Sequence, residues 1–214
     1  MGIKLSKRLL SLTTLITKVG TVVDVGCDHG HLSQYLLQHG LATKVIACDI
    51  SQSSLNKVTP LQNLSIRQGN GLNVLARDEV VDTVIIAGLG GMTILDILQN
   101  FFSREDRVYP ELILSPQSQV GKLREFLNKS GFMIVEDFVL LDVKFYDIIK
   151  AVYKNQSVQK LSKLDDLQLQ YGVFFKRPNE ALKQRLNIEL QRLSAFGDLK
   201  LSDINKINEV LKWQ

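Results

Sequence analysis

The segment of the sequence best suited to bind a ligand spans residues 22–32, Val-Val-Asp-Val-Gly-Cys-Asp-His-Gly-His-Leu. An apolar run that predicts a strand ends there in Asp24 and Gly26, and a glycine lets the main chain turn tightly and approach a ligand. The exposed N–H groups of the helix expected next favour an anionic group. The glycine fingerprint of dinucleotide-binding proteins would place its second glycine at Asp28, where a carboxylate repels a diphosphate and tolerates a cation such as a sulfonium. The alternative to a ligand-binding segment is an ordinary glycine-rich turn between a strand and a helix.

Three further segments end or follow the next three expected strands. Asp49 ends one run at the position where an acid reads the two ribose hydroxyls of a nucleoside ligand. In Gly69–Leu72, two glycines expose backbone, and Asn70 can donate to and accept from an adenine edge. In Ala87–Met92, glycines leave a floor without side chains that suits a flat base. Each segment alone is compatible with a simple turn, but all four coincide at the edge where open α/β sheets bind ligands.

A cluster of potential metal ligands, Cys27, Asp28, His29 and His31, lies in the first of these turns. Consecutive residues on a turn rarely converge on one ion, so we expect no metal site. His29 and His31 are instead expected to line the pocket or to cap the following helix.

The elements that must position these residues alternate between short β-branched runs and amphipathic segments. A leading helix is expected over residues 6–16, with Ser6 as its N-cap. Nearly all-apolar strands separated by helices predict a parallel sheet covered on both faces, and right-handed crossovers make it a doubly wound α/β domain. The strands are expected at residues 21–25, 44–48, 64–67, 83–87 and 111–114, and the helices between them at 32–38, 53–57, 92–102 and 120–129.

After Gly131 the pattern changes. Two long strand-like runs, residues 132–141 and 144–153, meet at Asp142 and predict a hairpin, an order that resembles the Rossmann-like sheet of class I methyltransferases. From about residue 155 the leucine spacing predicts three helices that pack as a coiled-coil-like lobe. The first is marked by Leu161, Leu164, Leu167 and Leu169, the second begins near Pro178, and the third has Ser202 as its candidate cap. We therefore expect two units, residues 1–154 and residues 155–214.

The net charge of +4 lies entirely in the C-terminal part of the 214-residue chain. Residues 151–214 hold 11 Lys/Arg and 7 Asp/Glu, whereas residues 1–150 hold 15 of each. A basic appendage beside a neutral body favours an anionic partner. The alternative explanation of this charge is a helix face that is simply exposed to solvent. On the leading helix, Lys7 and Arg8 either touch RNA phosphate or shape the ligand cleft, unless they belong to an ordinary helix surface.

The expected compartment follows from features that the sequence lacks. There are two cysteines, no apolar run of roughly 20 residues and no signal-peptide pattern at the N-terminus. We therefore expect a cytoplasmic protein that does not associate with a membrane and has no obligate protein partner.

Several of these segments together resemble the bacterial tRNA (adenine-22-N1)-methyltransferase family. The resemblance implies S-adenosylmethionine as methyl donor and N1 of adenine 22, in the D-arm region of a tRNA, as acceptor. The absence of an N-P-P-[YF] motif agrees, because that motif is associated with methylation of the exocyclic N6. The sequence departs from the family at Asn70 and Gln117, where members usually carry Asp and Asn, and both exchanges keep hydrogen-bonding ability. The motifs that carry the resemblance are Leu5–Leu9, Asp24–His29, Asp49, Gly69–Leu72, Ala87–Gly91, Leu114–Gln117 and Tyr146-Asp147.

The resemblance identifies Asp28 as the catalytic carboxylate. By accepting a hydrogen bond from the adenine N6 amino group, Asp28 would make N1 more electron-rich and stabilise the cationic product. Methyl transfer is an in-line displacement, so positioning supplies much of its acceleration. The residues expected to bind the cofactor are Asp24, Gly26, Cys27, Asp49, Ile50, Asn70, Gly71, Ala87 and Gly88. The residues expected to contact the RNA are Lys7, Arg8, His29, Gly90 and Gly91.

Two other functions are compatible with the sequence. A small-molecule methyltransferase would use the same strand-end motifs but would leave the basic appendage unexplained. A non-catalytic RNA-binding module with a vestigial pocket would be expected to have lost the site, yet Asp24, Gly26 and Asp49 are all present.

Overall fold

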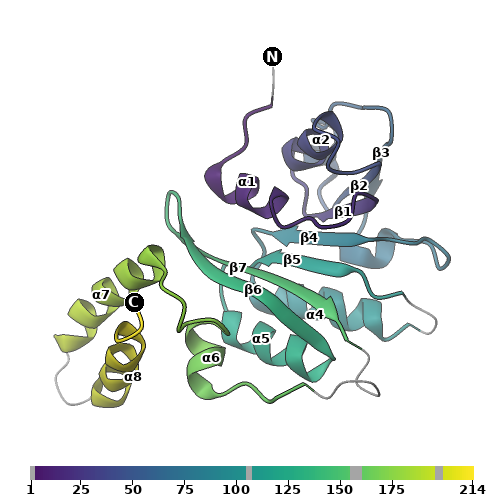
Figure 1. Cartoon of the computed structure of the whole chain (residues 1–214). Helices are drawn as coiled ribbons and strands as arrows, with labels where there is room; N and C mark the ends of the chain where they lie inside the picture. Colours follow the sequence, from purple (N-terminus) through teal and green to yellow (C-terminus); the bar gives the residue numbers. More distant parts are fainter. Residues whose placement is uncertain (1–2, 105–107, 155–160, 196–199) are drawn as a thin grey trace.

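The computed structural model describes residues 3–104, 108–154, 161–195 and 200–214. They form a seven-stranded sheet covered by helices (Figure 1), with the strand order β3-β2-β1-β4-β5-β7-β6. The strands are β1 (Thr21–Val25), β2 (Lys44–Asp49), β3 (Leu64–Gln68), β4 (Thr83–Ala87), β5 (Glu111–Ser115), β6 (Phe132–Leu141) and β7 (Phe145–Tyr153). The α-helices are α1 (Lys7–Thr13), α2 (His31–Gln38), α3 (Gln52–Leu55), α4 (Gly91–Phe102), α5 (Val120–Lys129), α6 (Asp166–Tyr171), α7 (Glu180–Ser194) and α8 (Leu201–Leu211), and a short 3-10 helix, η1, spans Gly71–Val74.

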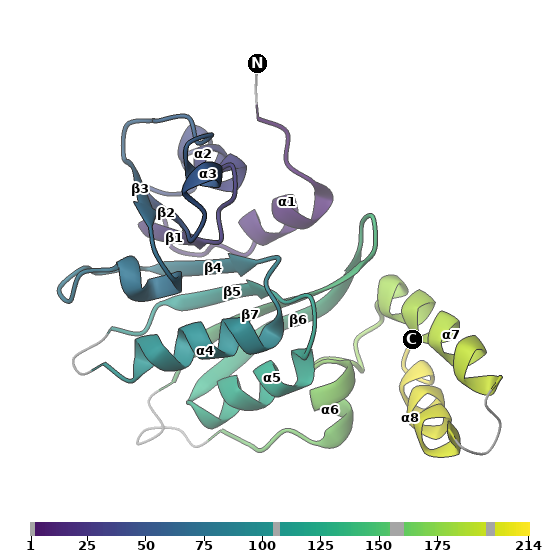
Figure 2. The same cartoon turned by 180° about the vertical axis from the view of Figure 1, so that it is seen from behind.

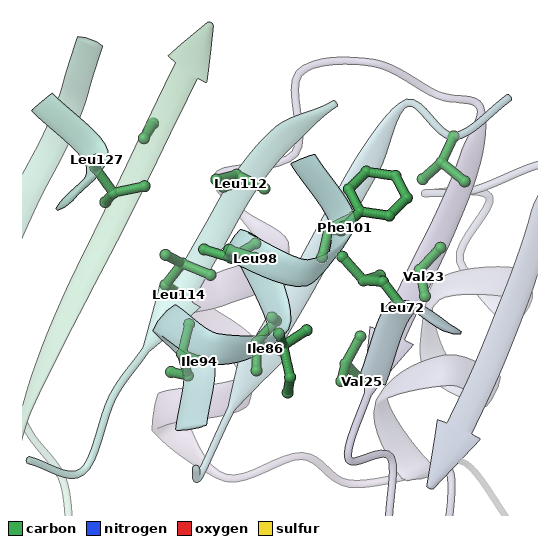
Figure 3. Close-up of a cluster of buried hydrophobic side chains, with 14 of the residues drawn as sticks. Val23, Val25, Leu72, Ile86, Ile94, Leu98, Phe101, Leu112, Leu114 and Leu127 are labelled. Carbon is green, nitrogen blue, oxygen red and sulfur yellow. The ribbon is translucent and has the colours of Figure 1, made fainter. Parts of the chain in front are cut away.

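The first five strands are parallel, which confirms the expected Rossmann-like sheet. Strands β1, β2, β4 and β5 are mostly buried, whereas β3, the outer strand, is only partly buried. Because successive side chains of a strand point to opposite faces, Val23 and Val25 of β1 join the cluster under α4 and α5, whereas Val22 joins the cluster under α1 and α2. Figure 2 shows α4 and α5 lying across their face of the sheet. Figure 3 shows Ile86 and Leu98 packing inside the first cluster.

The strand order reverses between β1 and β4, which are neighbours in the sheet although two strands separate them in the chain. Open α/β sheets bind ligands in the crevice at the carboxyl edge beside such a reversal. The four ligand-binding segments expected from the sequence lie at this edge, with Gly26 after β1, Asp49 at the end of β2, Gly69 after β3 and Gly88 after β4. The fold therefore brings them to one side of the molecule.

A buried ion-pair network attaches the hairpin and the C-terminal helices to the sheet. Arg124 of α5, which is 1% exposed, donates to Asp137 of β6 at 2.8 and 2.9 Å and to Asp147 of β7 at 3.0 Å. Arg185 of α7 donates to the second oxygen of Asp147 at 2.8 Å, and Arg124 also donates to the carbonyl of Leu169 at 3.0 Å. Removing one member would leave a buried charge uncompensated, so the network holds α5, β6, β7, α6 and α7 in one arrangement.

The first C-terminal helix is shorter than the leucine spacing predicted. Leu161 and Leu164 precede α6, and Leu164 packs against the main core cluster instead. The helix begins where it does because Asp165 and Gln168 form a capping box. The prediction of a helix marked by all four leucines is therefore wrong.

The second and third helices, α7 and α8, pack against each other as expected and project away from the sheet (Figure 1). Their core contains Leu186 of α7 and Val210 of α8, and it reaches Val139 at the end of β6. The predicted cap is wrong, because Ser202 lies inside α8 and the N-cap residue is Lys200. Residues 155–160, at the expected boundary between the two units, lie outside the described residues, so the boundary at residue 154 stays a prediction.

Candidate active site

The turn between β1 and α2 forms one wall of the site. Gly26, Asp28 and Gly30 have positive φ angles of 72°, 49° and 69°. Glycine adopts this left-handed conformation without strain, so Asp28 occupies a backbone position that favours glycine. The N–H groups of Gly26 and Cys27 both donate to the carbonyl of Cys48, at 2.8 and 3.0 Å, and so attach the turn to the end of β2.

Asp24 is the buried acid near the end of β1. Its carboxylate accepts a 2.6 Å hydrogen bond from the hydroxyl of Ser33 on α2, and the residue is 4% exposed. Burial raises the pKa of Asp24 from its usual 3.8 to about 6, although the hydrogen bonds from Ser33 lower it in part. A cationic ligand group beside Asp24 would favour its charged form, because an opposite charge lowers the pKa of a carboxyl.

Asp49 is held by two backbone groups at the end of β2. Its Oδ2 accepts from the N–H of Asp28 at 3.1 Å, and its Oδ1 accepts from the N–H of Ser51 at 2.8 Å. Each carboxylate oxygen can accept more than one hydrogen bond, so Asp49 keeps acceptor capacity for a ligand. A fixed carboxylate in this position suits the paired hydroxyls of a ribose.

The carboxylate of Asp28 is oriented but open to solvent. Its Oδ1 accepts from the hydroxyl of Ser54 at 3.2 Å and lies 3.6 Å from Nε2 of His29, and the side chain is 71% exposed. Lys57 Nζ lies 3.2 Å from the same His29 nitrogen. The Asp28 carboxylate is therefore accessible to a partner that enters from outside.

Arg8 of α1 places a cation beside Gly88, which follows β4. Its guanidinium lies 4.8 Å from the centroid of the Tyr146 ring, and its Nη1 is buried without a hydrogen-bond partner. A Cβ built on Gly88 would lie 3.6 Å from this Nη1, so the guanidinium stands close to the glycine that follows β4. An unsatisfied buried donor is unfavourable, and more so when it is charged, so this arrangement favours an anionic ligand group.

These groups surround one cavity of about 390 Å³ at the carboxyl edge of the sheet. The lining residues that the sequence predicted as site residues are Arg8, Asp24, Gly26, Cys27, Asp28, His29, Asp49, Ala87 and Gly88. His31 also lies on the wall, which agrees with one of the two roles considered for it. Leu9, Leu32 and Leu89 also line the cavity and were not predicted as site residues, and Gln117 was named only as part of a motif of the family that the sequence resembles. The strand-end position of Gln117, after β5, was the available signal for that residue.

The remaining predicted residues lie outside this cavity wall, and their roles stay predictions. They are Lys7, Ile50, Asn70, Gly71, Gly90 and Gly91. Two of the glycines are required by packing: a Cβ at Gly71 would lie 2.7 Å from Ile97 of α4, and a Cβ at Gly91 would lie 2.3 Å from the Ser118 carbonyl oxygen. The close approach of chain segments therefore explains these two glycines without a ligand.

A family model of a methyltransferase domain matches residues 5–149. The chain belongs to the methyltransferase domain family. The chain is 31% identical over 159 residues to the tRNA (adenine(22)-N(1))-methyltransferase of Bacillus subtilis strain 168. The alignment covers 70% of the chain and 65% of the relative, so it spans slightly less than two thirds of the B. subtilis protein.

Two solved structures are similar to the chain over nearly its whole length. TrmK of M. capricolum, in complex with S-adenosyl-homocysteine, has a TM-score of 0.82 and 25% identity, with 98% of each chain covered. A Streptococcus pneumoniae protein in complex with S-adenosyl-L-methionine has a TM-score of 0.86 and 26% identity, with 97% of this chain and 100% of that chain covered. These matches confirm the family resemblance drawn from the motifs.

Other kinds of site receive no support within the described residues. No group of three or more His, Cys, Asp or Glu side chains there is placed to hold a metal ion. Burial raises the pKa of the Cys48 thiol to about 12, so this group is protonated at neutral pH. No described helix of the chain has the length and apolar character needed to cross a membrane. A second cavity, of about 610 Å³, lies beside α5, α6 and α7, and none of the predicted site residues lines it.

Proposed function

We propose that this protein uses S-adenosylmethionine to methylate N1 of adenine 22 in tRNA. The observation that carries the proposal is the set of three charged side chains, Asp24, Asp49 and Arg8, on the wall of one cavity. S-adenosylmethionine has an ammonium group, a ribose diol and a carboxylate, and these three side chains complement them in charge and hydrogen bonding. The acceptor is taken from the B. subtilis relative, whose name specifies N1 of adenine 22 in tRNA.

Each side chain has a distinct part in holding the cofactor. Asp49 accepts hydrogen bonds from the ribose hydroxyls, and Asp24 pairs with the ammonium group and becomes fully ionised. Arg8 donates to the carboxylate, which satisfies its unpartnered Nη1. Of the two roles considered for Arg8, shaping the cofactor cleft suits this buried atom better than contact with an RNA phosphate. When bound, S-adenosylmethionine supplies an electrophilic methyl group on a sulfonium.

Asp28 aims the acceptor base. Its exposed carboxylate accepts a hydrogen bond from the N6 amino group of the target adenine, which fixes the ring and raises the electron density at N1. No general base is needed, because N1 already carries a lone pair. After transfer, the same carboxylate stabilises the positive charge of the N1-methyladenine ring. A preorganised charged group of this kind stabilises the transition state more than the ground state.

The C-terminal helices provide the docking surface for the RNA. Residues 151–214 hold the whole net charge of +4, and α7 and α8 project beyond the sheet (Figure 1). Lysine and arginine contacts to phosphate release counterions, so binding through this surface weakens as the salt concentration rises.

The decisive experiment is incubation with labelled S-adenosylmethionine and unmodified tRNA, followed by nucleoside analysis. We expect N1-methyladenine at position 22. Cofactor binding without methylation of any tRNA would favour a small-molecule methyltransferase, and RNA binding without cofactor binding would favour a non-catalytic module.

The matched variant for this assay is Asp28→Gly, because glycine accepts the φ of 49° without strain and removes the side chain that carries the carboxylate. Under single-turnover conditions we expect methyl transfer to slow by about 10²–10³. Cofactor affinity and the melting temperature should stay close to those of the unchanged protein. A normal transfer rate in this variant would remove Asp28 from the mechanism while leaving the overall activity intact.

A further inference from the structure

The tip of the β6–β7 hairpin, residues 142–144, exposes an apolar side chain beside the cavity. Val143 is 90% exposed, more than any other large hydrophobic side chain among the described residues. Tight hairpin turns favour Gly, Asn and Asp, so a β-branched residue has no local structural reason to occupy this tip. An exposed apolar group at a turn is instead suited to contact a partner.

The tip is held in place by α1. Lys7 Nζ donates to the carbonyl of Leu141 at 3.0 Å, and the N–H of Arg8 donates to the Asp142 carboxylate at 3.1 Å. The N–H of Asp142 donates to the carbonyl of Lys144 at 3.1 Å, which closes the turn. Figure 1 shows the tip extending beyond the sheet next to α1. Because α1 holds one side of the turn and a hydrogen bond closes the turn, Val143 is presented at a defined position.

The same contacts connect the tip to the active-site cavity. The backbone N–H of Arg8 donates to the Asp142 carboxylate, and the Arg8 side chain lines the cavity. Its guanidinium lies 4.8 Å from the centroid of the Tyr146 ring, and Lys144 Nζ lies 5.4 Å from the same centroid. A molecule that enters the cavity on the side of Arg8 and Tyr146 therefore passes the hairpin tip.

We propose that the hairpin tip is a wedge that enters the RNA next to the target adenine, with Val143 packing against the base that the adenine leaves behind. The inference rests on the proposed function, since an adenine stacked or paired within folded tRNA must leave its neighbours before N1 can meet the methyl group. Proteins that unstack bases insert apolar side chains into the gap. Exposed cations next to the tip, Lys7 and Lys144, complement the flanking phosphates.

The test compares Val143→Ala with Val80→Ala. Val80 is 61% exposed and precedes β4, at the opposite edge of the sheet, so the control removes the same atoms from a similarly exposed valine. Single-turnover methylation of tRNA at saturating S-adenosylmethionine should slow by roughly five- to fifteenfold in Val143→Ala, as expected for two methyl groups that lose an apolar contact. Val80→Ala and the conservative Val143→Ile should keep the original rate, and cofactor affinity should be the same in all variants.

A second readout reports base exposure directly. In a tRNA with 2-aminopurine next to the target adenine, fluorescence should rise when the unchanged protein binds, because the target adenine leaves the stack beside the probe, and should rise less with Val143→Ala. Equal rates and equal fluorescence for Val143→Ala and Val80→Ala, with the unchanged protein active on tRNA, would overturn the wedge alone. If the unchanged protein methylates no tRNA, the proposed function and the wedge both fail.

Discussion

Replacing Asp24 by asparagine should stabilise the fold and weaken cofactor binding at the same time. The buried carboxyl has a pKa of about 6 in the folded protein and 3.8 as its usual value, so the folded state holds the proton more tightly. Ionisation of Asp24 therefore opposes folding, and this cost develops as the pH rises from about 4 to about 6 and persists above it. Asparagine keeps the shape and an acceptor for Ser33 without the charge.

The magnitude follows from the difference between the two pKa values. At about 1.4 kcal/mol per pH unit, the ionised carboxylate costs the folded protein up to about 3 kcal/mol at neutral pH. The free energy of unfolding of Asp24→Asn should therefore exceed that of the unchanged protein by up to about 3 kcal/mol at pH 7.5. At pH 4 the gain should shrink to below about 1 kcal/mol, because Asp24 is then protonated in the folded state.

Urea denaturation without cofactor, at pH 7.5 and at pH 4, measures the difference in free energy of unfolding at each pH. Asp96→Asn on α4 is the control, since Asp96 is exposed and its loss removes the same formal charge. Calorimetry with S-adenosylmethionine should show the opposite effect for Asp24→Asn, a loss of affinity of about tenfold or more, because a charged hydrogen bond is removed. A variant that is no more stable than the unchanged protein at pH 7.5, or equally stabilised at both pH values, would refute the reasoning.

Two further predictions concern cofactor and RNA binding. Asp49→Ala should weaken S-adenosylmethionine binding about tenfold or more through loss of the ribose hydrogen bonds, measured by calorimetry beside a melting curve; unchanged affinity in a folded variant would reject the ribose assignment. A chain that ends at residue 177 keeps α6 and the contacts of Arg124 with it but lacks α7 and α8. Its melting temperature should fall, because it loses the ion pair of Arg185 with Asp147. At a temperature at which it is folded, it should bind S-adenosylmethionine like the full chain and bind tRNA more weakly, with a shallower salt dependence. Full-rate methylation of tRNA by this chain would contradict C-terminal docking.

The strands and most helices could be predicted because local periodicity reports burial. Val22, Val23 and Val25 place apolar side chains on both faces of the sheet because helices cover both faces, and the predicted bounds, residues 21–25, agree with β1. The spacing of the leucines could not decide the structure around Leu161 and Leu164. Leucines three residues apart are equally compatible with an extended segment that packs on a core, and Leu164, which precedes α6, packs on the main core. The capping box formed by Asp165 and Gln168 was the stronger signal there.

Two different physical constraints explain why glycine occupies positions in the predicted site segments. At Gly26 the positive φ belongs to the turn that borders the cavity, as the sequence predicted. At Gly91 the absence of a side chain lets the Ser118 carbonyl approach the start of α4. A motif cannot distinguish these cases, because the neighbour that excludes a side chain comes from another part of the chain.

The sequence by itself determined which edge of the sheet carries the site, since the carboxyl ends of parallel strands meet at one edge whatever the details of packing. Only the tertiary structure decided how the acids and the cation at that edge behave. The pKa of Asp24 depends on its burial among other elements, and the unpartnered Nη1 of Arg8 depends on how α1 lies against the hairpin. Arg8 and Asp142 are 134 residues apart in the chain, and no local pattern encodes a contact between segments so distant.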